Sequence, residues 1–523
     1  MKKIATLILA AAMVCGVSTG AKAIDFKASG QWIMSFDYGQ NGRFTGDNGS
    51  TGFNGRGNGG EDEFEARQRV RLQLDAVASE ALSGTVFFEI GDQVWGDDNA
   101  GNDGLQSRGG ALGADGVTVE VRRAYIDWMV PQTDLKVRMG IQGLQLPSFT
   151  AGSQVLDDDV AAVVASYQFN ENVGLTAFWA RPYNDNAGYT NRRGTQYANY
   201  MDNIDAFGLL LPLTFDGVKV TPWVMYAALG PGAMQNNGAG IAGTSAGWFT
   251  RGMLPVGGML HKDGSRANEK DFSRYGDAIW AGLTGEVTAF DPFRIAWDVN
   301  FGSASFDRSR ANRMGWVASL LLEYKLDWAI PGIYGWYASG DNGNPADGSE
   351  RMPVMHANGN NAFSNFAFNG NPYIAREGIL SKDMTGTWGI GARLKDMSFL
   401  EDLKHTFRIN FIGGTNSTTM TRYLGKNADF ANYGANGWYR NGANGSGVLG
   451  MPPLYMTTND YAMEFGLTNT YKMYENFTVM LDMAYLATWM DHSRKVWGNT
   501  MFNGDDDTVK DPWNVNVSFV YEF

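Results

Sequence analysis

Trp513-Asn-Val-Asn-Val-Ser-Phe-Val-Tyr-Glu-Phe523 is the stretch of this sequence that decides the fold. Every second residue from Trp513 to Phe523 is apolar or aromatic, the residues between them are polar, and only Val520 breaks the alternation. A period of two predicts a β-strand with one apolar and one polar face. An apolar strand at the edge of a sheet promotes aggregation unless another strand pairs with it. A barrel in which the last strand pairs with the first has no such edge.

The same alternation recurs along the rest of the chain. In the stretch 64–76, for example, the apolar residues Val70, Leu72, Leu74 and Ala76 oppose Arg67, Arg69, Arg71, Gln73 and Asp75. Comparable patterns are found in 26–37, 293–301, 403–411 and 461–471. The sequence therefore predicts an all-β protein built from many antiparallel strands.

The connections between these strands alternate in length. Short connections lie at 131–133, 170–172 and 215–217, whereas long, Gly- and Asn-rich connections lie at 230–275 and 417–459. Short turns at one end and long loops at the other are typical of outer-membrane β-barrels. The spacing predicts an up-and-down transmembrane barrel of about 18 strands, with about 16 as the alternative, and such barrels enclose an aqueous channel.

Composition separates this prediction from a soluble β-sandwich or β-helix, whose apolar faces would be rich in Val, Ile and Leu. Aromatic residues make up 13% of the chain and charged residues only 19%. Trp, Tyr, Phe and Met dominate the apolar faces, as they do in the interfacial girdles of membrane barrels. A single transmembrane barrel domain over 24–523 follows.

The N-terminus predicts export. Lys2 and Lys3 precede an apolar run, and Ala21-Lys22-Ala23 has the form of a cleavage site, so 1–23 reads as a signal peptide. Cleavage would remove three lysines and no acids and take the net charge from −13 to −16. This charge argues against nucleic acid as a partner. The only cysteine of the chain lies within the signal peptide, so stability must come from sources other than disulfides.

The third long connection, 142–160, differs from the others because it contains apolar residues and ends in three consecutive acids, Asp157, Asp158 and Asp159. The strands before it carry an unusual number of basic residues on their polar faces, namely Arg67, Arg69, Arg71, Arg122 or Arg123, Lys136 and Arg138. The break in alternation at Arg122-Arg123 predicts a β-bulge. Stacked arginines repel one another unless acids face them. The acids of the loop could face them across the lumen, or Glu65 and Glu89 could pair with them sideways along the wall.

These features resemble the trimeric general porins of outer membranes, and the stretch 119–160 is similar to the homotrimeric porins of sulfate-reducing bacteria. The resemblance implies a passive channel for small hydrophilic solutes in the outer membrane of a Gram-negative bacterium. It implies that the third loop bends into the lumen and that Asp157, Asp158 and Asp159 oppose the basic wall at a constriction. It also implies a homotrimer in contact with outer-membrane lipid and lipopolysaccharide. The terminal strand, through Phe519, Tyr521 and Phe523, resembles the signal that the barrel-assembly machinery reads.

Other functions have weaker support in the sequence. A substrate-selective porin would need a track of lumen aromatics, for which Trp128, Phe178 and Trp223 are candidates, and an adhesin would use the long acidic loops. Gly243-Thr-Ser245-Ala-Gly247 matches a nucleophile-elbow string but lacks the strand–turn–helix setting that this motif requires. The four histidines lack the spacing of metal ligands. We therefore expect no enzyme, no catalytic residue, no metal and no cofactor.

Overall fold

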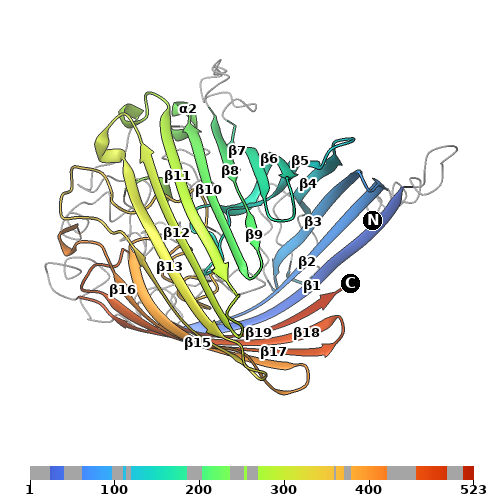
Figure 1. The fold of residues 1–523 in the computed structure, drawn as a ribbon. Coiled ribbons are helices and arrows are strands. Elements are labelled where there is room, and N and C mark those ends of the chain that lie inside the picture. Colours follow the sequence, from blue (N-terminus) through green and yellow to red (C-terminus); the bar gives the residue numbers. More distant parts are fainter. Residues whose placement is uncertain are drawn as a thin grey trace.

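In the computed structural model, the strands form one sheet that closes on itself into a barrel (Figure 1). The structure describes residues 24–40, 62–96, 110–112, 119–184, 203–235, 252–255, 269–357, 361–369, 379–420, 455–491 and 511–523. The predicted signal peptide, 1–23, lies outside the described residues, as do the Gly243–Gly247 string and Asp505 to Asp507.

Nineteen strand segments make up the sheet. The first ten are β1 (Asp25–Gln40), β2 (Asp62–Ser79), β3 (Leu82–Val94), β4 (Val119–Met129), β5 (Leu135–Gln145), β6 (Asp157–Gln168), β7 (Gly174–Tyr183), β8 (Ile204–Leu210), β9 (Leu213–Phe215) and β10 (Val218–Leu229). The others are β11 (Gly276–Val287), β12 (Phe293–Ser305), β13 (Arg313–Tyr324), β14 (Ile330–Ala338), β15 (Thr387–Leu400), β16 (Leu403–Gly414), β17 (Tyr461–Tyr474), β18 (Phe477–Trp489) and β19 (Trp513–Glu522). Because β8 and β9 pair with successive parts of β10, they fill one place in the barrel. The barrel therefore has the predicted 18 strands, and the alternative of 16 is wrong.

The first and last strands close the barrel, as the terminal alternation predicts. β1 and β19 run antiparallel in register from Gln31 opposite Glu522 to Gln40 opposite Trp513. On the inner side of this seam the amide of Asn516 donates to Ser35 at 2.7 Å and to Asp37 at 2.8 Å. The N- and C-terminal ends of the described chain lie at the same end of the barrel, where the short turns are (Figure 1).

The two faces of each strand differ as predicted. On β12, Phe293, Val299 and Phe301 are exposed on the outside, whereas Asp298 and Asn300 are buried on the inside. A closed sheet leaves no backbone edge unpaired, and an apolar outer face matches the lipid interior. The architecture is that of an outer-membrane β-barrel.

The predicted bulge is present on β4. Phe87 of β3 pairs with Arg123 and Phe88 with Val121, so Arg122 is an additional residue between two paired positions. As a result Arg122 and Arg123 both reach groups on the inner side of the wall, although they are neighbours in sequence.

Part of the barrel interior is packed. A buried apolar cluster joins residues of the β5–β6 connection (146–156) and of the β14–β15 connection (339–386) to inward side chains of the strands, among them Phe363, Phe366, Trp280 and Trp336. The named helical segments of the described ranges are short: α2 (Pro231–Gln235), η1 (Glu269–Asp271) and η2 (Ser309–Ala311). No helix in the described ranges has the length and apolar character needed to cross a membrane.

Candidate pore-lining site

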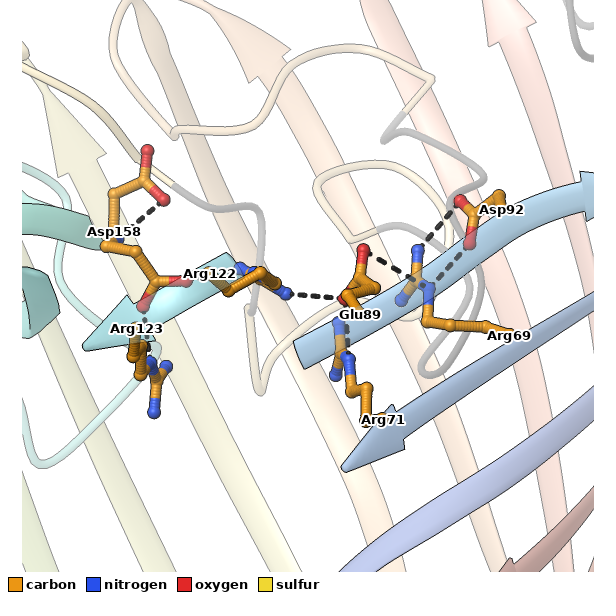
Figure 2. Close-up of polar contacts among 8 residues, drawn as sticks. Arg69, Arg71, Glu89, Asp92, Arg122, Arg123 and Asp158 are labelled. Atoms are coloured by element: carbon orange, nitrogen blue, oxygen red, sulfur yellow. Dashed lines mark hydrogen bonds and ion pairs between the residues drawn. The ribbon is translucent and has the colours of Figure 1, made fainter. Parts of the chain in front are cut away.

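A chain of ion pairs runs along the inner wall from β2 to β6 (Figure 2). Arg69 contacts Asp92 at 2.5 Å, and Arg71 contacts Glu89 at 2.8 Å. Glu89 also accepts from Arg122 at 3.0 Å, so one carboxylate joins arginines of β2 and β4. These side chains meet because Arg71 and Glu89 are directly opposite in the antiparallel register, on the same face of the sheet.

Asp159 continues this chain of charges on β6. One of its carboxylate oxygens lies 2.7 Å from Arg122, and the other lies 2.6 Å from Arg123. Arg123 also lies over the ring of Phe87, 5.5 Å from the ring centroid. The bulge at Arg122 brings two guanidinium groups to one carboxylate. A strictly alternating strand would have turned one of them to the lipid side.

The other predicted basic residues pair with nearby acids as well. Arg67 contacts Glu65 two residues away on β2, at 2.6 Å. On β4 and β5, Arg138 forms two hydrogen bonds of 2.8 Å with Asp127, and Lys136 lies 3.6 Å from the same carboxylate. Sideways pairing along the wall, one of the two alternatives left open by the sequence, is therefore present for these basic residues.

The three consecutive acids do not lie in a loop, as the sequence suggested, because Asp157 to Asp159 are the first residues of β6. They also have different partners. Gln145 donates to Asp157 at 3.1 Å, and Asp158 lies 3.1 Å from the ring nitrogen Nδ1 of His356. Asp159 contacts Arg122 and Arg123, both of β4.

The segment 146–156, which precedes these acids, contacts a strand of the wall that is distant in the sheet, β12. Ser148 donates to the carboxylate of Asp298 on β12 at 2.5 Å, and the backbone N–H of Phe149 donates to it at 3.0 Å. The N–H and hydroxyl of Thr150 bind the same carboxylate. Asp298 is an inward residue with 3% exposure, so β12 holds residues 148–150 from inside the barrel.

A second internal segment, 361–369, is held by Glu464 of β17. The backbone N–H groups of Asn365 and Phe366 donate to Oε1 of Glu464 at 3.0 and 2.8 Å, and Asn410 donates to Oε2 at 2.7 Å. Phe363 in the same segment stacks on Tyr334 of β14, with ring centroids 4.2 Å apart. A buried carboxylate is stable there because several donors replace its water.

A second row of paired charges crosses the wall under these segments. Arg294 bridges Glu286 and Glu323, each at 2.8 Å, and Arg393 contacts Glu323 at 2.6 Å. Glu323 of β13 and Arg393 of β15 meet across β14 because the inward position between them is Gly332, which has no side chain to separate them.

Exposure shows which part of the wall borders water. The side chains of Arg123 and Lys136 are 42% and 48% exposed, although both belong to the inner wall. Those of Glu323 and Arg393 are only 7% and 6% exposed. Exposed charged side chains therefore remain on the inner face of β4 and β5, whereas the internal segments cover Glu323 and Arg393 on β13 and β15.

The aromatic candidates for a solute track do not form one. Trp128 is 38% exposed beside outward residues of the wall, opposite Leu82 and Val137. Phe178 and Trp223 point inward but are buried in the apolar cluster. The resemblance implied an inward bend of the third long connection, but the second internal segment, 361–369, and the two anchors, Asp298 and Glu464, were not predicted from the sequence. The only feature of the sequence that pointed to these anchors was a single acid on the inward face of each strand.

Among the described residues, no group of three or more His, Cys, Asp or Glu side chains could hold a metal ion. Two histidines, His356 and His405, are described, and His261 and His492 lie outside the described residues.

Comparisons with known proteins give a likeness in fold. No family model and no curated protein match the chain. Among solved structures, OccAB3 of Acinetobacter baumannii is 10% identical, with a TM-score of 0.49, over 95% of this chain and 100% of that chain. OpdQ of Pseudomonas aeruginosa is 11% identical, with a TM-score of 0.48, over 95% and 98%. OprD of Pseudomonas aeruginosa is 10% identical, with a TM-score of 0.47, over 97% and 99%.

Proposed function

We propose that this protein is a passive diffusion channel for small hydrophilic solutes and ions across the outer membrane. The observation that supports this most directly is the set of exposed charges on the inner face of the barrel. Inside a closed barrel, the charged side chains of Arg123 and Lys136 stay exposed on β4 and β5. Water and polar solutes can pass beside such a wall, since its charges compensate for lost hydration.

The internal segments also favour selection among solutes. Residues 148–150 and 361–369 are fixed by several hydrogen bonds each, so the remaining path has a defined width. A substrate-selective porin is therefore the second candidate. Swelling rates of proteoliposomes in a series of sugars, amino acids and dicarboxylates would distinguish the two, because a general porin ranks solutes by size alone.

Reconstitution into planar bilayers tests the channel itself. The purified protein should give discrete conductance steps, and a salt gradient should give a reversal potential. Replacing Arg123 and Lys136 together by Gln should shift this potential toward cations. The matched control, Arg274→Gln, removes a charge from an 87% exposed side chain outside the barrel strands and should leave it unchanged. A protein that inserts but never conducts would be a structural surface protein or an adhesin.

Three expectations from the resemblance belong to this proposal. The chain would form a homotrimer, would contact phospholipid and lipopolysaccharide, and would be inserted by the barrel-assembly machinery. A detergent-solubilised mass three times that of one chain would support the trimer, and a mass of one chain would reject it without affecting the channel.

A further inference from the structure

The outer face of the barrel carries an apolar groove of about 690 Å³ across β12–β16. Two rows of outward residues build it. The row farther from the turns runs in register from Ile295 through Leu322, Ile333 and Ala392 to Ile409. The row nearer the turns contains Phe293, Tyr324, Pro331, Leu394 and Phe407.

The groove exists because small residues stand between large ones. On one side, the rings of Phe293 and Tyr324 meet edge to face with centroids 4.8 Å apart. On the other side, Phe407 is 41% exposed. Between these ridges the outward side chains of Pro331 and Ala392 are short, so the wall is lower there.

The groove lies just inside one membrane interface. At the adjacent turns, Trp328 stacks on Phe399 with centroids 5.8 Å apart, and both rings are exposed. Exposed aromatic pairs of this kind mark the interface in barrels. The exposed Lys325 directly follows Tyr324 at this end and brings a positive charge to the level of lipid headgroups.

The dimensions of the groove favour one flexible acyl chain over a second protein as its occupant. A stable protein interface buries about 800 Å² on each partner. The convex wall of another barrel cannot follow a narrow concavity. If a methylene group takes about the volume of a water molecule, the groove holds roughly twenty of them. That is the size of a single acyl chain.

We propose that the groove across β12–β16 binds one acyl chain of a phospholipid from the turn-side leaflet, with the lipid phosphate near Lys325. The proposal requires that the barrel lies in a membrane but is independent of whether it conducts. Short turns of outer-membrane barrels face the periplasm, so the lipid would come from the periplasmic leaflet.

Native mass spectrometry of the full chain tests the proposal, with phosphatidylglycerol added to the detergent-solubilised protein. Ala392→Trp fills the floor of the groove and should lower lipid occupancy about tenfold, the loss expected when two methylene groups are displaced. The matched control is Ala318→Trp, which places the same ring on the outer face of β13 away from the groove and should retain the lipid. Lys325→Gln should weaken the binding of phosphatidylglycerol more than that of the zwitterionic phosphatidylcholine.

Several outcomes would overturn the proposal. Equal occupancy in the two Trp variants would place the lipid elsewhere, and stronger retention of lipopolysaccharide than of phosphatidylglycerol would assign the wrong leaflet. A dimer that disappears in Ala392→Trp would mean that a second copy covers the groove. If Ala392→Trp fails to fold, Ile333→Ala removes an exposed side chain from the same row and should change occupancy where Ala318→Trp does not.

Discussion

The hydroxyl of Ser364 donates a 2.9 Å hydrogen bond to Oε1 of Glu464, a residue 100 positions away in the sequence. Two backbone N–H groups of the same segment share this oxygen, so one inward carboxylate of β17 fixes a turn of chain inside the barrel. We expect the width of the lumen to depend on such buried acids as well as on the number of strands.

Removing the Glu464 carboxylate should widen the path through the lumen. In Glu464→Ala the N–H of Asn365 and the hydroxyl of Ser364 lose the acceptor that they share, at about 1–3 kcal/mol for each unsatisfied group. Residues 361–369 should then leave their position, and single-channel conductance should rise. Asp205→Ala is the control, because Asp205 pairs with Arg181 on the neighbouring strand and not with the described residues of 361–369. Equal conductance in the two variants would show that 361–369 does not limit the path.

A disulfide can test where residues 148–150 lie. The hydroxyl oxygens of Thr150 and Ser319 are 2.7 Å apart, and the only native cysteine is in the predicted signal peptide. In the mature protein, Thr150→Cys with Ser319→Cys should form a disulfide under mild oxidation and lose both thiols to maleimide labelling. Thr150→Cys with Ser303→Cys, whose second position is on the outer face of β12, should keep both thiols. Free thiols in the first pair would place the segment away from β13.

The barrel was predictable because its signal is local and repeated. Alternation in 26–37 and 513–523 fixes which side chains face lipid, and these two stretches meet in the closing seam. The bulge at Arg122-Arg123 was predictable for the same reason, since two consecutive polar residues cannot share one face of a regular strand.

The interior was less predictable because it depends on contacts between distant residues. Nothing near Asp298 indicates that it will bind Ser148, which is 150 positions away. The run Asp157 to Asp159 suggested one acidic cluster, but β6 starts at Asp157 and side chains on a strand point in alternating directions. Asp158 therefore points away from the side shared by Asp157 and Asp159, and Asp159 pairs with Arg122 and Arg123.

The terminal residue should matter for assembly. Phe523 exchanges two backbone hydrogen bonds with Gly30 of β1, and its ring stacks on Tyr521. Phe523→Asp should greatly reduce the heat-modifiable, membrane-inserted form and leave protein in the periplasm. Phe399→Asp changes another exposed aromatic at the turn end, 71% exposed against 47% for Phe523, without touching the seam and should insert far better. Equal insertion of both variants would show that the last strand has no special role in assembly.

The last prediction concerns the charge balance of the open wall. Asp159 lies between Arg122 and Arg123, so Asp159→Asn leaves two guanidinium groups with one negative charge fewer. Anion permeability relative to cation permeability should rise about twofold to fivefold, since a unit charge a few Å away in water contributes about 1 kcal/mol or less. Arg123→Gln should change the ratio in the opposite direction.

The double variant, Asp159→Asn with Arg123→Gln, restores the net charge and should return the reversal potential close to that of the parent. This cycle separates an effect of charge from an effect of altered shape, because two independent distortions would not cancel. Asp327→Asn, in the β13–β14 turn, removes the same charge outside the lumen and should have little effect. If Asp159→Asn conducts with the parental reversal potential, permeating ions do not pass close to the arginines of β4.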